Sequence, residues 1–185
     1  MKNGLPPYRA LVIGAGRIGA TFDAPRSERI LTHAHAYAAH PDFELAGFVD
    51  VDKAAAAAAA ATWGGKAYQS IEDAVRAEPI DVVSVCVPDE QHLEAIEAVK
   101  RCGIKGGIFE KPLTGDSEQS FRICRDPFFA GRPFLVNYSR RFVPEFRALA
   151  QEVASGAYGR FIGGSGCYGK GLMHNGSHLL DFLSV

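Results

Sequence analysis

The tripeptide Glu110-Lys111-Pro112 places a carboxylate and a lysine directly after the apolar run Gly107-Ile108-Phe109, which we interpret as the end of a buried strand. Open α/β sheets bind their ligands outside the carboxyl ends of their strands, so Lys111 is expected at a ligand site. A lysine in a dry crevice can exchange a proton near neutral pH. Proton transfer to or from a reacting group is therefore the chemistry that this lysine would supply.

A glycine-rich turn, Gly14-Ala15-Gly16-Arg17-Ile18-Gly19, follows the apolar stretch 8–13 and matches the pattern G-x-G-x-x-G. In that pattern the first glycine permits a tight turn, the second lets the backbone approach a pyrophosphate, and the third allows a helix to pack closely on a strand. The helix that follows offers free amides and a positive dipole end to phosphate. We therefore predict that the turn binds a dinucleotide through Gly14, Gly16, Arg17, Ile18 and Gly19.

Asp50 follows the second predicted strand, where the fingerprint expects an acidic residue. Its carboxylate can accept hydrogen bonds from a ribose diol, and its charge would repel a 2′-phosphate. The sequence thus favours NAD over NADP as the cofactor. Asp52 competes for the ribose role, and we prefer Asp50 because it lies nearer the strand end.

The segment Val87-Pro88-Asp89-Glu90-Gln91-His92 ends the strand that contains Cys86 and faces the same crevice. It is predicted to bring backbone to the nicotinamide side of the cofactor. For His92, direct contact and a purely structural bond to nearby backbone are equally open. The predicted cofactor contacts at this edge are Val87, Pro88, His92, Glu110 and Lys111.

His174 and His178 have the i, i+4 spacing that could hold a metal on a helix. The intervening Asn175-Gly176 argues against a continuous helix there, and no third ligand is evident, so no metal site is predicted. His178 opens an apolar helical pattern and is better suited to donate or accept a proton.

The candidate site residues must be held in place by strands and helices. Apolar β-branched runs alternate with helical patterns, which predicts an α/β fold with a Rossmann-type, doubly wound parallel sheet. The predicted strands span 8–13, 44–49, 81–87, 105–109 and 133–137, and the predicted helices span 53–63 and 90–102. Between 19 and 44 we expect a short helix broken near Pro25, a polar loop and a second helix over 32–39. That loop would form either part of the active-site rim or a surface excursion.

A change of pattern after Asn137 predicts the start of an α+β substrate domain. A helix is expected over 144–154, a glycine-rich strand over 160–168 and an apolar helix from His178. The sequence stops inside this last pattern, which leaves the apolar face of the helix unburied. We therefore predict a dinucleotide-binding Rossmann domain over 1–136 and an incomplete C-terminal substrate and oligomerisation domain over 137–185.

Composition narrows the classes of partner. The net charge of −1, with 47% hydrophobic and 22% charged residues, gives no electrostatic reason to expect nucleic acid or an anionic membrane as a partner. No apolar run approaches the roughly 20 residues that cross a bilayer, and no signal peptide is evident. The four cysteines have neither C-x-x-C nor zinc-ligand spacing. A cytoplasmic protein with reduced thiols is expected.

The ordered set of motifs resembles the Gfo/Idh/MocA family of NAD(P)-dependent oxidoreductases, which includes glucose–fructose oxidoreductase and inositol dehydrogenase. The resemblance runs from about Leu11 to Val185. The matching motifs are Gly14-x-Gly16-x-x-Gly19, Asp50, Pro88-x-x-x-His92, Glu110-Lys111-Pro112, Arg140-Arg141-Phe142 and Gly176-x-His178-x-x-Asp181. The resemblance implies hydride transfer between nicotinamide and a carbinol or carbonyl carbon of a sugar, polyol or sugar derivative.

The resemblance also implies individual roles. Lys111 would contact substrate and cofactor and assist proton transfer, and His178 would be the catalytic acid or base. The implied substrate contacts are Lys111, Arg141, His174, Asn175 and His178, although His174 stands where the family often has an aspartate. Family members are usually longer and form subunit interfaces through their C-terminal domain, so a homo-oligomer is implied for the full-length form. The alternative function is a non-catalytic nucleotide-binding module.

Overall fold

The structure is a computed structural model that describes residues 6–160 and 162–184. The chain divides into two compact units, Met1–Val136 (unit 1) and Asn137–Val185 (unit 2). No helix in the described part of the chain is long and apolar enough to cross a membrane.

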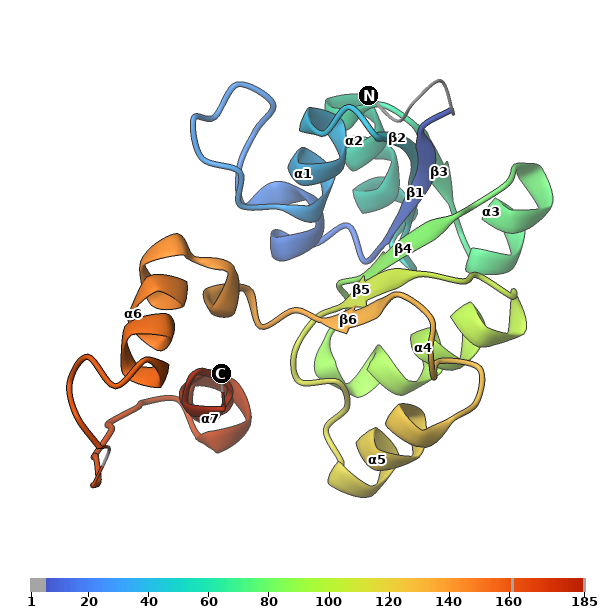
Figure 1. Ribbon diagram of the computed structural model, residues 1–185. Coiled ribbons are helices and arrows are strands. Elements are labelled where there is room, and N and C mark those ends of the chain that lie inside the picture. Colours follow the sequence, from blue (N-terminus) through green and yellow to red (C-terminus); the bar gives the residue numbers. More distant parts are fainter. Residues whose placement is uncertain (1–5, 161, 185) are drawn as a thin grey trace. The chain divides into compact units, whose positions relative to one another are not determined.

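Unit 1 is built on a parallel sheet with the strand order β3-β2-β1-β4-β5-β6 (Figure 1). The order reverses between β1 and β4, which creates the switch point at which doubly wound sheets bind ligands. The strands are β1 (Tyr8–Ile13), β2 (Phe43–Val49), β3 (Lys66–Tyr68), β4 (Val82–Val85), β5 (Gly107–Phe109) and β6 (Phe134–Val136). This sheet confirms the predicted α/β, Rossmann-type fold.

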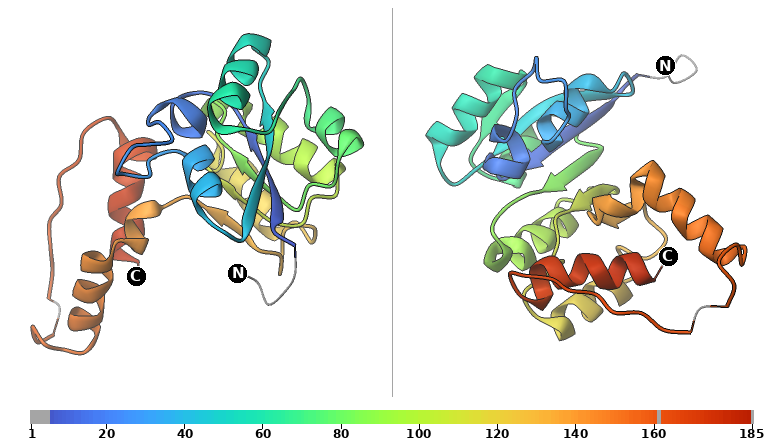
Figure 2. Two further views of the ribbon diagram at one scale, coloured as in Figure 1. Left: turned by 90° about the horizontal axis from the view of Figure 1, so that it is seen from above. Right: turned by 90° about the vertical axis from the view of Figure 1, so that its left-hand side faces the viewer.

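Helices cover both faces of this sheet, and the alternation of side chains along β1 explains why. Ala10 and Val12 enter a core with Tyr37 of α1 and Trp63 of α2, whereas Leu11 and Ile13 enter a second core with residues of α3, α4 and α5. The views in Figure 2 show the two helical layers. The helices are α1 (His33–Ala39), α2 (Lys53–Trp63), α3 (Ile71–Ala77), α4 (His92–Arg101) and α5 (Ser117–Arg125), with short helical turns η1 (Arg17–Thr21) and η2 (Asp89–Gln91).

Local signals account for the ends of α2. The Asp52 side chain accepts hydrogen bonds from the Ala54 and Ala55 amides at its start, and Gly64 ends it with a φ of +87°. The predicted limits of β1 and α2 are confirmed. Three elements were missed by the sequence analysis, namely β3, α3 and α5. The predicted break of the first helix near Pro25 is also misplaced, because η1 already ends at Thr21.

Unit 2 contains η3 (Ser139–Phe142), α6 (Pro144–Ala154), η4 (Leu172–Gly176) and α7 (Ser177–Leu183). The predicted α6 is confirmed. The strand predicted over 160–168 is wrong: the described residues of that stretch have no regular structure, and residue 161 lies outside the described residues. A single strand without a neighbour cannot satisfy its backbone hydrogen bonds, and no strand in the described part of unit 2 pairs with it.

The expected interruption at Asn175-Gly176 is also wrong, because η4 runs directly into α7. The chain widens there to a π-type turn, in which the Gly176 amide donates to the Gly171 carbonyl at 3.2 Å. Gly176 serves packing: a Cβ at this position would lie 2.8 Å from the ring of Tyr168. The glycine therefore permits a close contact with Tyr168 and does not stop the helix.

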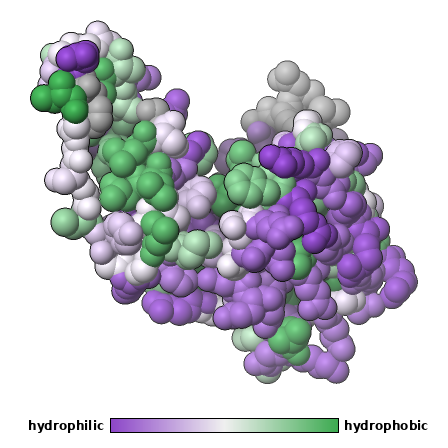
Figure 3. Space-filling view, turned by 90° about the horizontal axis from the view of Figure 1, so that it is seen from below, coloured by the Kyte–Doolittle hydropathy of each residue, from purple (hydrophilic) through white to green (hydrophobic). Residues whose placement is uncertain are grey.

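Unit 2 exposes much apolar surface, as the green areas at the left of Figure 3 show. The exposed large apolar side chains of α6 and α7 include Phe146, Leu149, Val153, Leu180 and Leu183. On α7, the helix whose apolar face the sequence analysis expected to remain unburied, Leu180 and Leu183 are exposed, whereas Leu179 and Phe182 are half-buried.

Candidate functional site

The glycine turn after β1 leaves open space at one glycine and close contacts at the other two. Gly14 has a φ of +95°, and a Cβ there would lie 2.7 Å from the Cys86 backbone. A Cβ at Gly19 would lie 2.0 Å from the carbonyl oxygen of Gly14, whereas one at Gly16 would meet nothing within 4 Å. The turn is therefore tightly packed at Gly14 and Gly19 and open at Gly16, where a pyrophosphate would approach. The residues present fit a dinucleotide.

Arg17 and Ile18 lie in η1, directly after this opening. The Arg17 guanidinium lies 4.5 Å from the centre of the exposed Phe22 ring, a cation–π contact that holds the side chain beside the turn. Ile18 packs against the core between the sheet and α2. Arg17 thus brings positive charge to the glycine turn, and Ile18 anchors the turn to the sheet.

Asp50 lies at the end of β2 and faces the glycine turn. One carboxylate oxygen accepts from the Ala15 amide at 2.8 Å, and the other accepts from the Asp52 amide at 2.9 Å. Each oxygen keeps a lone pair for a ribose hydroxyl. The carboxylate of the competing Asp52 caps α2 instead. The geometry therefore favours Asp50 as the ribose acceptor.

His92 lies at the start of α4 and its side chain is completely buried. Its Nδ1 is 2.7 Å from the Pro112 carbonyl oxygen, and its Nε2 is 3.0 Å from the Val87 carbonyl oxygen. The imidazole therefore joins the backbone after β4 to the turn after β5. Val87 is half-buried and Pro88 exposed at this edge, so His92 would act on a ligand through the backbone that it holds.

Glu110 and Lys111 follow β5, and the Lys111–Pro112 peptide bond is cis. The Lys111 side chain is half-buried. The Glu110 carboxylate accepts a long hydrogen bond, 3.4 Å, from the Lys111 amide, and its other oxygen lies 2.9 Å from Nε2 of His33. The turn that carries the lysine is therefore tied to α1 through the carboxylate next to it.

The partner of Glu110 belongs to a buried polar group that the sequence analysis missed. His33 Nδ1 lies 2.8 Å from Oγ of Ser84, which in turn lies 2.9 Å from the Tyr37 hydroxyl. Burial raises the pKa of Tyr37 to about 12. The signal in the sequence was weak: Ser84 is a single polar residue inside an apolar strand. Tyr37 lies 47 positions from Ser84 in the sequence, and His33 lies 51 positions from it. Contacts over such separations cannot be inferred from the local sequence pattern.

Cys86, which directly follows β4 and packs against Gly14 and Gly19, is a buried thiol. Its pKa is raised well above the usual value, mainly by burial and further by the negative charge of Glu110. A thiol with a raised pKa is a poor nucleophile, so Cys86 acts as a packing residue behind the turn.

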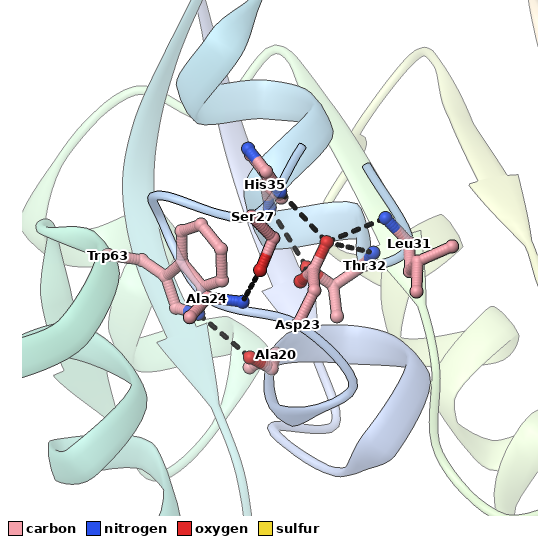
Figure 4. A network of polar contacts seen from close by, with 8 residues as sticks. All are labelled: Ala20, Asp23, Ala24, Ser27, Leu31, Thr32, His35 and Trp63. Atoms are coloured by element: carbon pink, nitrogen blue, oxygen red, sulfur yellow. Dashed lines mark hydrogen bonds and ion pairs between the residues drawn. The ribbon is translucent and has the colours of Figure 1, made fainter. Parts of the chain in front are cut away.

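The loop between η1 and α1 is fixed by one carboxylate (Figure 4). Asp23 accepts from the Leu31 amide at 2.6 Å, from the Thr32 hydroxyl at 2.6 Å and lies 2.8 Å from Nδ1 of His35. Burial disfavours the charge of Asp23, but the hydrogen bonds from Thr32, Leu31 and His35 outweigh it and lower the pKa of this carboxyl. The side chain is only 2% exposed. The loop is therefore anchored at its base.

Apart from Lys111, which belongs to unit 1, the predicted substrate contacts lie in unit 2. Asn175 and His178 line a cavity of about 350 Å³ together with Arg140, Phe146, Cys167, Tyr168, Gly169, Leu179 and Phe182. The His178 ring packs edge-on to Tyr138, with ring centres 5.7 Å apart. His174 is exposed and does not line this cavity. Among residues 6–160 and 162–184 there is no group of three side chains that could hold a metal.

Arg141 makes an ion pair within unit 2. Its Nε donates to Asp181 at 3.2 Å, and a second guanidinium nitrogen contacts the other oxygen of the same carboxylate. This two-point hydrogen bonding raises the pKa of Arg141. The pair joins η3 to α7 and thus braces the helix that carries His178.

The strand order, the glycine turn and the acidic residue after β2 define a dinucleotide-binding domain of the Rossmann class. The model of the oxidoreductase family GFO_IDH_MocA, NAD-binding Rossmann fold, matches residues 8–137. The chain belongs to this family, as the resemblance of its motifs predicted.

Several relatives are inositol dehydrogenases. The inositol 2-dehydrogenase of Corynebacterium glutamicum strain R is 35% identical over 156 residues, which cover 83% of this chain and 43% of the relative. The crystal structure of a myo-inositol dehydrogenase from Corynebacterium glutamicum ATCC 13032 has a TM-score of 0.65 at 29% identity, over 83% of this chain and 43% of that chain. The chain therefore spans less than half the length of these relatives.

A more distant structure shares the fold over nearly the whole chain. The scyllo-inositol dehydrogenase of Lactobacillus casei, solved with NAD(H) and scyllo-inositol, has a TM-score of 0.77 at 21% identity. The similarity covers 96% of this chain and 55% of that chain.

Proposed function

We propose that the protein is an NAD-dependent oxidoreductase that transfers a hydride between nicotinamide and a CH–OH carbon of a sugar or polyol. One observation carries the proposal: the glycine turn, Asp50 and the Lys111 turn follow β1, β2 and β5 at the carboxyl edge of one sheet. That edge is where the cofactor of a doubly wound sheet lies. The names of the relatives support a polyol as the substrate class.

The residues of unit 1 would hold the cofactor. The amides from Gly14 to Gly19 would bind the pyrophosphate, with Arg17 beside it, and Asp50 would accept from the adenosine ribose. Because the Asp50 carboxylate would repel a 2′-phosphate, NAD is favoured over NADP. The bound cofactor supplies the hydride acceptor or donor. The backbone after β4 and β5, at Val87, Pro88, Glu110 and Lys111, would face its nicotinamide end.

Two side chains, Lys111 and His178, would assist proton transfer. Lys111 would hold the substrate oxygen and stabilise negative charge that develops on it, and His178 would accept the hydroxyl proton. Arg141, His174 and Asn175 are proposed as substrate contacts, with Arg141 already engaged by Asp181. These roles are supported by the resemblance of the motifs and, for Asn175 and His178, by their shared cavity.

The remaining proposals concern the whole protein. Residues 1–136 would be the cofactor domain and residues 137–185 part of a substrate domain. The exposed apolar side chains of α6 and α7 are consistent with a homo-oligomer in the full-length form. A cytoplasmic location is supported by four unpaired cysteines, since a reducing compartment keeps thiols in this state.

Titration with NADH and NADPH, followed by fluorescence, tests the cofactor first. We expect NADH to bind at least about tenfold more tightly, a difference of about 1.4 kcal/mol. Absence of binding for both nucleotides refutes the proposal, and preference for NADPH refutes the role of Asp50.

Turnover with myo-inositol and other polyols, followed as NADH absorbance, tests the reaction. Lys111→Ala and His178→Ala should each lower kcat by roughly 10²–10⁴-fold, the usual contribution of an acid–base group, with little change in NADH affinity. Wild-type turnover in both variants would remove these assignments. NADH binding without turnover on any polyol would instead indicate the non-catalytic module.

A further inference from the structure

A chain of buried polar groups leads from the core to the turn that carries Lys111. It runs from the Tyr37 hydroxyl to Ser84, from Ser84 to His33 and from His33 to the Glu110 carboxylate, with separations of 2.9, 2.8 and 2.9 Å. Its members come from α1, β4 and the end of β5. Ser84 is completely buried, and Tyr37 and His33 are at most 8% exposed. Buried polar groups of this kind must satisfy one another, because water does not reach them.

The hydrogen positions in a neutral His33 follow from the acceptor at the end of the chain. A carboxylate only accepts, so Nε2 of His33 must carry the hydrogen that faces Glu110. Nδ1 is then an acceptor, and the Ser84 hydroxyl donates to it. The Tyr37 hydroxyl in turn donates to Ser84, and the raised pKa of Tyr37 keeps that hydrogen in place. Every donor therefore points toward Glu110.

Glu110 is held from two sides by this arrangement. One carboxylate oxygen receives Nε2–H of His33, and the other receives the amide of Lys111. The side chain next to the lysine cannot rotate without breaking one of these bonds. The Glu110 carboxylate thus connects the lysine turn to a histidine that lies 78 positions before Lys111 in the sequence.

We propose that His33 is a positioning residue for Lys111, which it orients through the Glu110 carboxylate. The proposal rests on the proposed oxidoreductase function and adds to it a residue that does not touch cofactor or substrate. Because Glu110 is only 13% exposed, loss of the hydrogen bond from His33 would destabilise its carboxylate in the present position, and the turn would move with it.

Two neutral substitutions separate this role from packing. In His33→Gln, the side-chain amide can place an N–H where Nε2 lies, so the bond to Glu110 is kept. In His33→Asn, the shorter amide reaches only the Nδ1 position, so the contact with Ser84 is kept and the bond to Glu110 is lost. His40→Gln, at the exposed end of α1, is the matched control.

Steady-state kinetics of polyol oxidation are measured for the wild type and the three variants. We expect His33→Asn to lower kcat by about 10–100-fold with KM and the Kd for NADH within about threefold, and His33→Gln and His40→Gln to stay within about threefold of wild type in kcat. Equal kcat in the two His33 variants, at matched thermal stability, overturns the proposal.

A second measurement keeps the two proposals separate. The backbone amide resonance of Lys111 reports the position of the Glu110 carboxylate, because that amide donates to it. We expect this resonance to shift in His33→Asn and to stay near its wild-type position in His33→Gln. If the wild type neither binds NADH nor oxidises a polyol, the proposed function fails, and an unshifted Lys111 amide in His33→Asn then overturns the positioning role as well.

Discussion

Alanine substitutions at Gly16 and Gly19 should separate nucleotide binding from folding. The two glycines lie in the same turn, but they differ in their surroundings. A Cβ at Gly19 would lie 2.0 Å from the Gly14 carbonyl oxygen, more than 1 Å inside an ordinary contact of about 3.4 Å. The nearest atom is backbone and cannot rotate away, so the turn itself must shift. Overpacking of this kind costs about 1–3 kcal/mol.

Gly16 offers the opposite case. Its φ of −76° is accessible to alanine, and the added Cβ would meet no atom within 4 Å. We expect the free energy of unfolding of Gly16→Ala to stay within about 0.5 kcal/mol of wild type, the usual range for a site without packing constraints. The methyl group would occupy the space in which the backbone approaches the pyrophosphate, so NADH affinity should fall by tenfold or more, about 1.4 kcal/mol.

Thermal unfolding by circular dichroism and calorimetric titration with NADH measure the two effects. Gly19→Ala should lower Tm by several degrees, since a loss of about 1 kcal/mol in the free energy of unfolding corresponds to a Tm shift of roughly 2–8 °C in small and mid-sized domains. Gly16→Ala should keep the Tm of the wild type and lose affinity. Wild-type affinity in Gly16→Ala would refute the assignment of the open side of the turn to the pyrophosphate. A wild-type Tm in Gly19→Ala would refute the packing argument.

Three further substitutions test single contacts. Asp50→Asn should raise the affinity for NADPH relative to NADH by about tenfold in fluorescence titrations, because the repulsive charge is removed; an unchanged ratio would contradict this. His92→Leu should lower the free energy of unfolding in urea by about 1–3 kcal/mol, because a buried carbonyl group loses its hydrogen-bond donor; a loss under 0.5 kcal/mol would contradict the bridging role. The pKa of the Asp23 carboxyl is lower in the folded protein than its ordinary value of 3.8, so the ionised carboxylate stabilises the fold at pH values above 3.8. This stabilisation is lost as the pH falls through the pKa of the folded state. Asp23→Asn should therefore be less stable at pH 7 and show a smaller loss on acidification, and parallel urea curves for the two proteins from pH 7 to pH 3 would argue against it.

The sequence predicted the elements whose signals are local. The apolar run of β1 and the alanine run of α2 were sufficient to predict both limits of each element. The glycine turn was located by its spacing together with the strand before it and Asp50 after the second strand. By contrast, β3 has only three residues, of which the first two are exposed, so its apolar signal is weak. The helix α5 has few buried residues, although Asp116 at its N-cap could have revealed its start.

The polar contacts that tie the site together could not be predicted in the same way. The fingerprint predicted that Asp50 binds a ribose, but it did not predict the hydrogen bond that Asp50 accepts from the Ala15 amide. For His92 the sequence left direct contact and backbone bonding open, and both of its ring nitrogens have backbone partners. Such pairings depend on which strands lie side by side, which a local pattern does not contain.

The first turn of α1 shows how the anchored loop and the lysine turn depend on one another. Thr32 and His35 are three residues apart, so they lie on the same side of the helix, and both contact Asp23. His33 is rotated by about 100° from Thr32, so its imidazole points to Ser84 and Glu110 instead. One helical turn therefore holds the base of the loop with one face and the lysine turn with another. A shift of the loop base would therefore be expected to displace the start of α1, and His33 with it.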